Sequence, residues 1–164
     1  MKSDSTIFAY IDGANLHRGV KSLRWELDYT RLRVWLSDKY GVGRAYLFIG
    51  YIPKNKDLYT ELQEAGFTLV FKDVIYDGLG KAKGNCDADL IMQAMRDSYE
   101  GIAMKAVLVT SDGDYTPLVK FWLEKGQLEV ILSPAPDEKC SLLLKRTGAH
   151  IAYIGDQKSI LEVQ

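Results

Sequence analysis

The fold of this chain is indicated by the stretch Ile7-Phe8-Ala9-Tyr10-Ile11-Asp12-Gly13, in which an apolar run ends at an aspartate. Short continuous apolar runs are typical of parallel strands that are buried on both faces. A second stretch has the same form: Ala106-Val107-Leu108-Val109 runs into Thr110-Ser111-Asp112-Gly113-Asp114. Open α/β sheets bind their ligands outside the carboxyl ends of the strands. We therefore expect both sets of acids to lie at one edge of a parallel sheet.

The rest of the chain alternates apolar runs with amphipathic segments, a pattern that favours a parallel sheet with crossover helices. A glycine-rich turn is expected at residues 77–80. The segments predicted as strands are residues 6–11, 44–52, 67–76, 105–110, 128–132 and 150–154. Those predicted as helices are residues 28–40, 55–65, 87–100, 115–125 and 138–146.

Composition limits the class of protein. A length of 164 residues, 47% of them hydrophobic, suits one globular domain. The formal net charge of −1 argues against a strongly basic surface, although a local basic patch can still attract a polyanion. Cys86 and Cys140 lack metal-ligand or redox spacing, and we expect both to be reduced. With no signal-peptide pattern and no membrane-length apolar run, we expect a cytoplasmic protein without membrane partners.

A third acidic pair, Asp87 and Asp89, begins the amphipathic segment at residues 87–100. On a helix, Asp87 falls on the apolar stripe that includes Leu90 and Ala94, whereas Asp89 lies about 200° away on the solvent side. A carboxylate on a core-facing stripe is costly unless it is paired or metal-bound. This favours a site role for Asp87 and a bystander role for Asp89, with helix capping as the alternative for Asp87.

The acids that follow the strands have a simpler alternative as well. Asp12 can be a helix N-cap, Asn15 a turn residue, and either Asp112 or Asp114 a turn or cap residue. Their convergence instead favours a metal site, and an oxygen-only ligand set suits Mg²⁺ or Mn²⁺. Zinc is not expected, because the two histidines, His17 and His150, have no ligand partner at suitable spacing.

Basic residues near these acids are candidates to hold a phosphate backbone. Lys81 and Lys83 stand in a glycine-rich turn before Asp87, and Ser111 is a further candidate substrate contact. Each of the basic residues has surface solvation as its alternative role. The other candidates are Lys21, Arg24, Lys54 and Lys56.

The motifs Tyr10–Leu16, Lys83–Asp87 and Val109–Tyr115 together resemble the NYN domain family, in particular its LabA-like group, within the PIN-like nuclease superfamily. The likeness covers nearly the whole chain and implies a single NYN domain over residues 1–164. It also implies a three-layer α/β/α Rossmann-like sandwich with a mostly parallel sheet of five to six strands.

The same resemblance implies metal-dependent hydrolysis of RNA, which we expect to be single-stranded. Protein partners or a homodimer are the other expected interactions. The acids that match the family's metal-binding and catalytic positions are Asp12, Asp87, Asp112 and Asp114, and Asn15 matches the asparagine of its first motif. The expected ion is Mg²⁺ or Mn²⁺. Two features differ from the family pattern: the Lys-Gly-x-x-Asp spacing is one residue longer than usual, and Gln93 stands where many relatives have an aspartate.

The leading hypothesis is therefore a ribonuclease in which an aspartate-held ion binds the scissile phosphate and activates water. The alternative is a catalytically silent module that binds RNA or protein on the same fold. Dinucleotide binding is disfavoured because no Gly-x-Gly-x-x-Gly follows the first strand. A phosphatase of the haloacid dehalogenase type is disfavoured because Ala14 stands where its second aspartate is needed.

Overall fold

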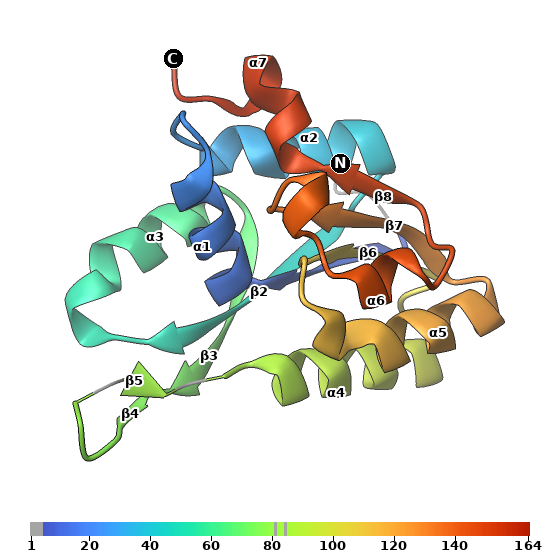
Figure 1. Ribbon diagram of the computed structural model, residues 1–164, viewed down its shortest axis with the longest axis horizontal. Coiled ribbons are helices and arrows are strands. Elements are labelled where there is room, and N and C mark those ends of the chain that lie inside the picture. Colours follow the sequence, from blue (N-terminus) through green and yellow to red (C-terminus); the bar gives the residue numbers. More distant parts are fainter. Residues whose placement is uncertain (1–4, 81, 84) are drawn as a thin grey trace.

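The protein is built on a six-stranded sheet with strand order β3-β2-β1-β6-β7-β8, and all neighbouring strands in it are parallel. The computed structural model (Figure 1) describes residues 5–80 and 85–164, and the backbone of residues 82–83. The strands of this sheet are β1 (Ile7–Asp12), β2 (Arg44–Tyr51), β3 (Phe67–Asp73), β6 (Lys105–Val109), β7 (Leu128–Ser133) and β8 (Ile151–Tyr153).

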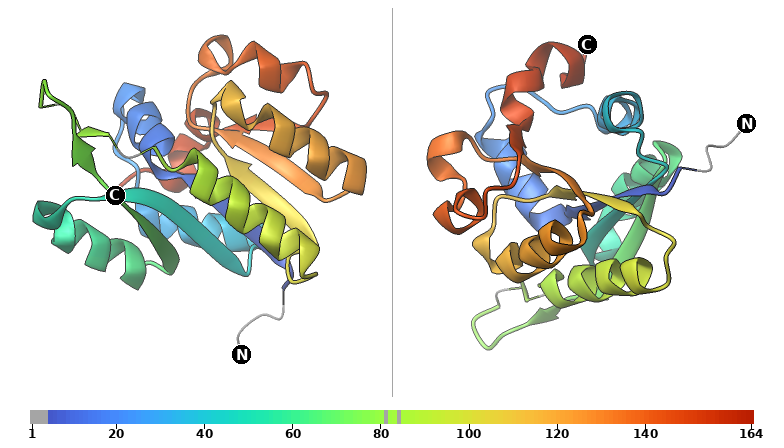
Figure 2. Two further views of the ribbon diagram at one scale, coloured as in Figure 1. Left: turned by 90° about the horizontal axis from the view of Figure 1, so that it is seen from below. Right: turned by 90° about the vertical axis from the view of Figure 1, so that its right-hand side faces the viewer.

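Helices cover both faces of the sheet, which confirms the expected three-layer α/β architecture (Figure 2). One face carries α1 (Gly13–Ser22), α2 (Tyr29–Tyr40), α3 (Lys56–Glu64) and α7 (Lys158–Leu161). The other carries α4 (Asp87–Tyr99), α5 (Thr116–Lys125) and α6 (Leu142–Lys145). Short 3₁₀ turns complete the connections: η1 (Pro53–Asn55), η2 (Gly113–Tyr115), η3 (Asp137–Lys139) and η4 (Ile154–Gln157).

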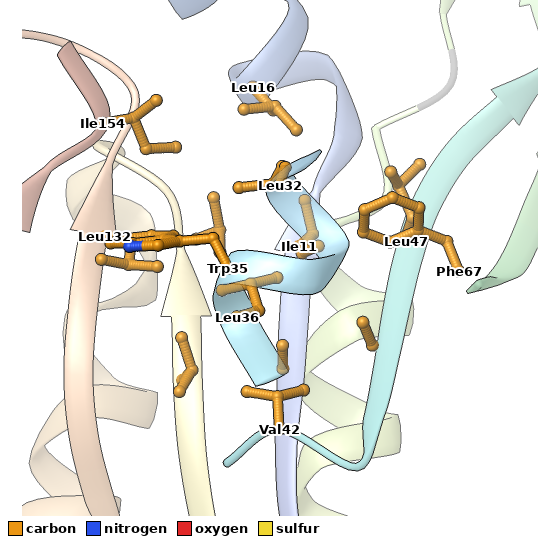
Figure 3. Close-up of a cluster of buried hydrophobic side chains, with 14 of the residues drawn as sticks. Ile11, Leu16, Leu32, Trp35, Leu36, Val42, Leu47, Phe67, Leu132 and Ile154 are labelled. Atoms are coloured by element: carbon orange, nitrogen blue, oxygen red, sulfur yellow. The ribbon is translucent and has the colours of Figure 1, made fainter. Parts of the chain in front are cut away.

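Strand β1 has a core on each side, which is why its sequence is continuously apolar. Ala9 and Ile11 face the helices α1, α2 and α3, in the cluster shown in Figure 3. Phe8 and Tyr10 face α4 and α5. Successive side chains of a strand point to opposite faces, so a strand covered on both sides has no polar positions in its interior.

The order of the strands reverses next to β1. The chain passes from β1 outward to β2 and β3, then returns to β6 on the other side of β1 and continues outward to β7 and β8. Such a reversal opens a crevice at the carboxyl ends of the two central strands, because the connections leave them in opposite directions. The end of β1 and the end of β6 therefore border the place where a ligand is expected.

Two predicted elements are wrong in their extent. Residues 67–76 form not one strand but β3 and the separate two-residue strand β4 (Ile75–Tyr76), which pairs with β5 (Ala82–Lys83) in an antiparallel hairpin. Residues 138–146 do not form one helix, because Cys140 has an extended backbone and the Ser141 side chain caps a new helix, α6. The remaining predicted strands and helices are confirmed to within a few residues.

The structure also contains α1, the helix that the capping alternative for Asp12 implied, directly after β1. A further helix that the sequence did not predict, α7, packs near the C-terminal end of the chain against α2. Among the described residues, no helix combines the length and the apolar character needed to cross a lipid bilayer.

Helix α4 carries a buried carboxylate on the side that faces the sheet. Asp97 is fully buried, and it accepts hydrogen bonds from the Tyr10 hydroxyl (2.8 Å) and from Nε2 of Gln93 (2.8 Å). Asp97 comes seven residues after Leu90, almost two full helical turns, so it falls on the core-facing stripe. Burial and the neighbouring Asp97 both raise the pKa of Tyr10, so its hydroxyl keeps its proton. These bonds supply the partners that a buried acid requires.

We predict that Tyr10→Phe lowers the free energy of unfolding by about 1–3 kcal/mol, because Asp97 would lose one of its two side-chain donors. Urea denaturation followed by circular dichroism measures the change. The matched control is Tyr51→Phe, whose exposed ring carries a hydroxyl without a hydrogen bond to any described residue. An equal loss of stability in both variants would contradict a role for the Tyr10–Asp97 bond.

Candidate functional site

Three aspartates from distant parts of the chain meet at the crevice. Asp12 comes from the end of β1, Asp87 from the start of α4, and Asp112 from the loop after β6. One oxygen atom from each lies within 4.8 Å of the others. Asp12 is buried, and the other two side chains are half-buried. The structure thus brings together three of the acids that the sequence reading selected.

Asp12 ends β1 and also caps α1. Its Oδ1 atom accepts a hydrogen bond from the backbone N–H of Asn15 (3.1 Å), as an N-cap residue does. Gly13 allows this sharp start of α1, because a Cβ atom there would come within 2.5 Å of the Phe48 carbonyl oxygen on β2. Asp12 is therefore an N-cap, as the alternative interpretation predicted. The capping hydrogen bond also holds its carboxylate at the crevice.

Asn15 joins α1 to the loop after β6. Its Oδ1 atom accepts hydrogen bonds from the backbone N–H (2.9 Å) and the hydroxyl (3.1 Å) of Ser111. Asn15 is buried, so these bonds form away from bulk solvent. The contact fixes the loop that carries Asp112 relative to the helix that Asp12 caps. Asn15 is therefore placed to position the acids, and the Ser111 hydroxyl donates to Asn15.

The two acids of the second motif differ in position. Oδ1 of Asp112 accepts a hydrogen bond from the backbone N–H of Asp114 (2.9 Å) at the start of η2. Asp114 itself is exposed and lies outside the group of three. Gly113 packs tightly against Ser141 and Leu143, so a side chain at this position would collide with α6.

Tyr115 lies beneath the acids and links two of them, a role that sequence reasoning missed. Its ring is fully buried, and its hydroxyl is 2.8 Å from Oδ1 of Asp87 and 3.2 Å from Oδ2 of Asp12. Burial, followed by the charges of these two acids, raises the pKa of Tyr115, so the hydroxyl stays protonated and donates to the pair. The only signal in the sequence is its position directly after the second acidic motif.

Asp87 lies at the first turn of α4, where its N–H is capped by Oδ1 of Asn85 (2.8 Å). Asp89, as expected, points elsewhere: it is exposed and lies 3.6 Å from Nζ of Lys72. Gln93 does not reach the acids, because its amide is bonded to Asp97. Lys81 and the side chain of Lys83, both candidate substrate contacts, lie outside the described residues.

The electrostatics of the group favour a cation. Burial raises the pKa of Asp12, and the charge of Asp87 raises it further, while the Asn15 N–H, Tyr115 and Arg18 act in the opposite direction. Within the described part of the chain, none of the three acids forms an ion pair. Three converging carboxylates that form no ion pair with a described residue make a donor set that fits Mg²⁺ or Mn²⁺.

The nearby thiol is not a nucleophile at neutral pH. Cys86 precedes Asp87 and is buried, and burial together with the charges of Asp12 and Asp89 raises its pKa to about 11. A thiol reacts as its thiolate, so Cys86 is chemically inert under these conditions.

Comparison with known proteins agrees with this architecture. Residues 6–152 match the sequence profile of the NYN domain. The fold is similar to the crystal structure of a protein of unknown function from Vibrio parahaemolyticus, with a TM-score of 0.76 and 22% sequence identity over 98% of this chain and 99% of that one. No curated protein is significantly similar in sequence. The match does not distinguish the LabA-like group, which stays a prediction.

The profile spans most of the chain and includes every segment that contributes to the acidic group, from β1 to the loop after β6. Its boundaries therefore enclose the candidate site and all of the fold except the elements after residue 152. The chain belongs to the NYN domain family, and through it to the PIN-like nuclease superfamily.

Proposed function

We propose that this protein is a metal-dependent ribonuclease that hydrolyses phosphodiester bonds in single-stranded RNA. NYN domains are typically nucleases, and the chain has a group of aspartates suited to a divalent ion. The observation that carries the proposal is the convergence of Asp12, Asp87 and Asp112 at the crevice, with no ion pair to any basic side chain among the described residues.

In this proposal Asp12, Asp87 and Asp112 hold Mg²⁺ or Mn²⁺, with Asp114 at the solvent side of the same loop. When bound, the ion supplies the Lewis acidity that polarises a phosphoryl oxygen and lowers the pKa of water. Tyr115 holds its proton between Asp12 and Asp87 and so keeps both carboxylates oriented toward the third. Asn15 keeps the loop of Asp112 in place through Ser111. Each of these residues acts by position, and no side chain forms a covalent bond to the substrate.

The first prediction from this proposed function concerns cleavage. With labelled single-stranded RNA and Mn²⁺ or Mg²⁺, Asp112→Asn should reduce the rate by more than ~100-fold, beyond the loss typical of residues that only orient a ligand. The control Asp89→Asn, at an exposed acid that pairs with Lys72, should retain full activity. Cleavage that survives both EDTA and Asp112→Asn would refute the metal site. RNA binding without cleavage under any ion would favour the silent module instead.

A second prediction concerns stability. Asp12→Asn removes one negative charge from a crowded group while keeping an oxygen to cap α1. We expect the metal-free melting temperature to rise by about 2–4 °C, the shift that about 1 kcal/mol produces in a chain of this size. Mg²⁺ or Mn²⁺ should raise the melting temperature of the native protein but not that of Asp12→Asn, because a ligand stabilises only the state that binds it.

Differential scanning calorimetry with and without the ion measures both effects. Asp89→Asn again serves as the control and should keep the metal-induced rise. An Asp12→Asn variant that is still stabilised by the ion would show that the ion binds elsewhere.

A third prediction separates positioning from binding. Tyr115→Phe removes the proton donor between Asp87 and Asp12 without removing a carboxylate. We expect the affinity for Mn²⁺, measured by isothermal titration calorimetry, to fall about 10–100-fold, as for other residues that orient metal ligands. Tyr51→Phe is the matched control. An unchanged affinity in Tyr115→Phe would show that the acids are oriented without this hydroxyl.

A further inference from the structure

A deep cleft opens directly beside the acidic group. It has a volume of about 630 Å³ and extends from Asp12, Asp87 and Asp112 across the carboxyl half of β2. Its walls come from α1 and α3, which lie on the same face of the sheet (Figure 1). Ligand sites in proteins are concave, largely apolar pockets of roughly 300–1,000 Å³. The cleft is within this range and continuous with the proposed site.

The interior of the cleft is apolar. Leu47 and Ile49 form its floor on β2, and Leu58, Tyr59 and Leu62 form the wall on α3. Ile49 and Leu58 are only partly buried, although they adjoin the core. The Tyr59 hydroxyl is already satisfied by the backbone of Gly50 and Ile52, so the ring presents no unpaired polar group. Such a surface suits the faces of a planar, weakly polar group.

Polar side chains line the mouth of the cleft. His17 and Arg18 from α1 and Asn55 from η1 line it. None of these three side chains forms a hydrogen bond or ion pair with another described residue. Arg18 is exposed and sits close enough to Asp12 for its charge to be felt there. An arginine that forms no ion pair with a described residue, beside the proposed metal-binding acids, is suited to bind a second phosphate of the same RNA molecule.

We propose that this cleft binds the nucleobase of the nucleotide next to the scissile phosphate, with Arg18 on a flanking phosphate. The proposal rests on the proposed function, because it takes the acidic group as the place of the phosphate. A group that enters the cleft while linked to that phosphate must have apolar faces and polar edges, and a base has both. Asn55 and His17 are placed to meet its edges at the mouth.

The first test is equilibrium binding in the presence of Mg²⁺. Each of the four nucleoside 5′-monophosphates is titrated against ribose 5-phosphate, which has the phosphate and sugar without the base. The readout is the NMR signals of the Leu and Ile methyl groups. We expect at least one nucleotide to bind about tenfold or more tightly than ribose 5-phosphate, the size of a stacking contribution. Its addition should shift the methyl signals of Ile49 and Leu58.

Leu58→Trp fills the cleft and should remove this preference for the base. Leu123→Trp makes the same exchange on α5, in the opposite layer, and should retain it. Circular dichroism and Mn²⁺ titration establish that each variant is folded with its acids in place. Equal affinities for nucleotides and ribose 5-phosphate in the native protein would overturn the proposal. So would nucleotide binding that Leu58→Trp leaves intact, or methyl shifts confined to residues outside the cleft.

The RNA cleavage assay distinguishes this proposal from the proposed function. Cleavage without base-dependent binding in the cleft would overturn the base site and leave the ribonuclease standing. Base-dependent binding without cleavage under any ion would overturn the ribonuclease and leave the cleft as a nucleotide-binding site. Base-dependent binding together with RNA cleavage that Leu58→Trp weakens would support both.

Discussion

Strands β1 and β6 pair in parallel at the centre of the sheet, with Ile11 opposite Val109, although they lie far apart in the sequence. This pairing brings the residues that follow each strand to the same edge. The chain turns away from the two strands in opposite directions, which opens a crevice between their ends. Asp12 and Asp112 face each other because of this contact, and α4 adds Asp87 from the connection that leads to β6.

Close negative charges have to be held against their repulsion, and the protein does this with neutral donors. The Asn15 N–H contacts Asp12, the Asp114 N–H contacts Asp112, and the Tyr115 hydroxyl contacts both Asp12 and Asp87. None of these donors carries a positive charge. Neutral donors fix a carboxylate without neutralising it, so the negative potential remains available to a cation. Asp97, a second buried acid among the described residues, is also held by neutral donors. It lies on the core-facing side of α4 and is fully buried.

The parts of the fold that followed from the sequence are those in which local pattern and tertiary environment agree. The apolar run of β1 and the helical spacing of α2 are of this kind, and the fold class follows from their alternation. The prediction for residues 67–76 was wrong because apolar residues resume after Lys72 and Asp73, past the end of the sheet, where Ile75 and Tyr76 are exposed. Residues 138–146 misled because the Ser141 N–H is bonded to the Ser111 carbonyl, a tertiary contact that breaks the helix.

The residues of the candidate site also differ in whether the sequence alone could predict them. Asp12, Asp87 and Asp112 were accessible to strand-end and helical-wheel arguments, and Asp89 was set aside on the same grounds. Asp114 falls outside the group because the cap of η2 turns its side chain to solvent, a detail of a few dihedral angles. Asp97 was detectable, since it shares the stripe of Leu90, whereas the role of Tyr115 depends on packing between α4 and η2. The cleft depends on the spacing between two helices, which no local pattern encodes.

The acidic group and the lining of the cleft differ in how many separate segments of the sequence contribute to them. The acids come from three separate stretches, so any change in the fold would disperse them. Apart from the α1 residues at its mouth, most of the apolar lining of the cleft comes from one continuous stretch, Leu47 to Leu62, which is β2, η1 and α3. Exchanging this stretch between relatives would replace most of the apolar lining without altering Asp12, Asp87 or Asp112. If the proposed roles hold, the ligand preference of the cleft can diversify among relatives while the acidic group stays constant.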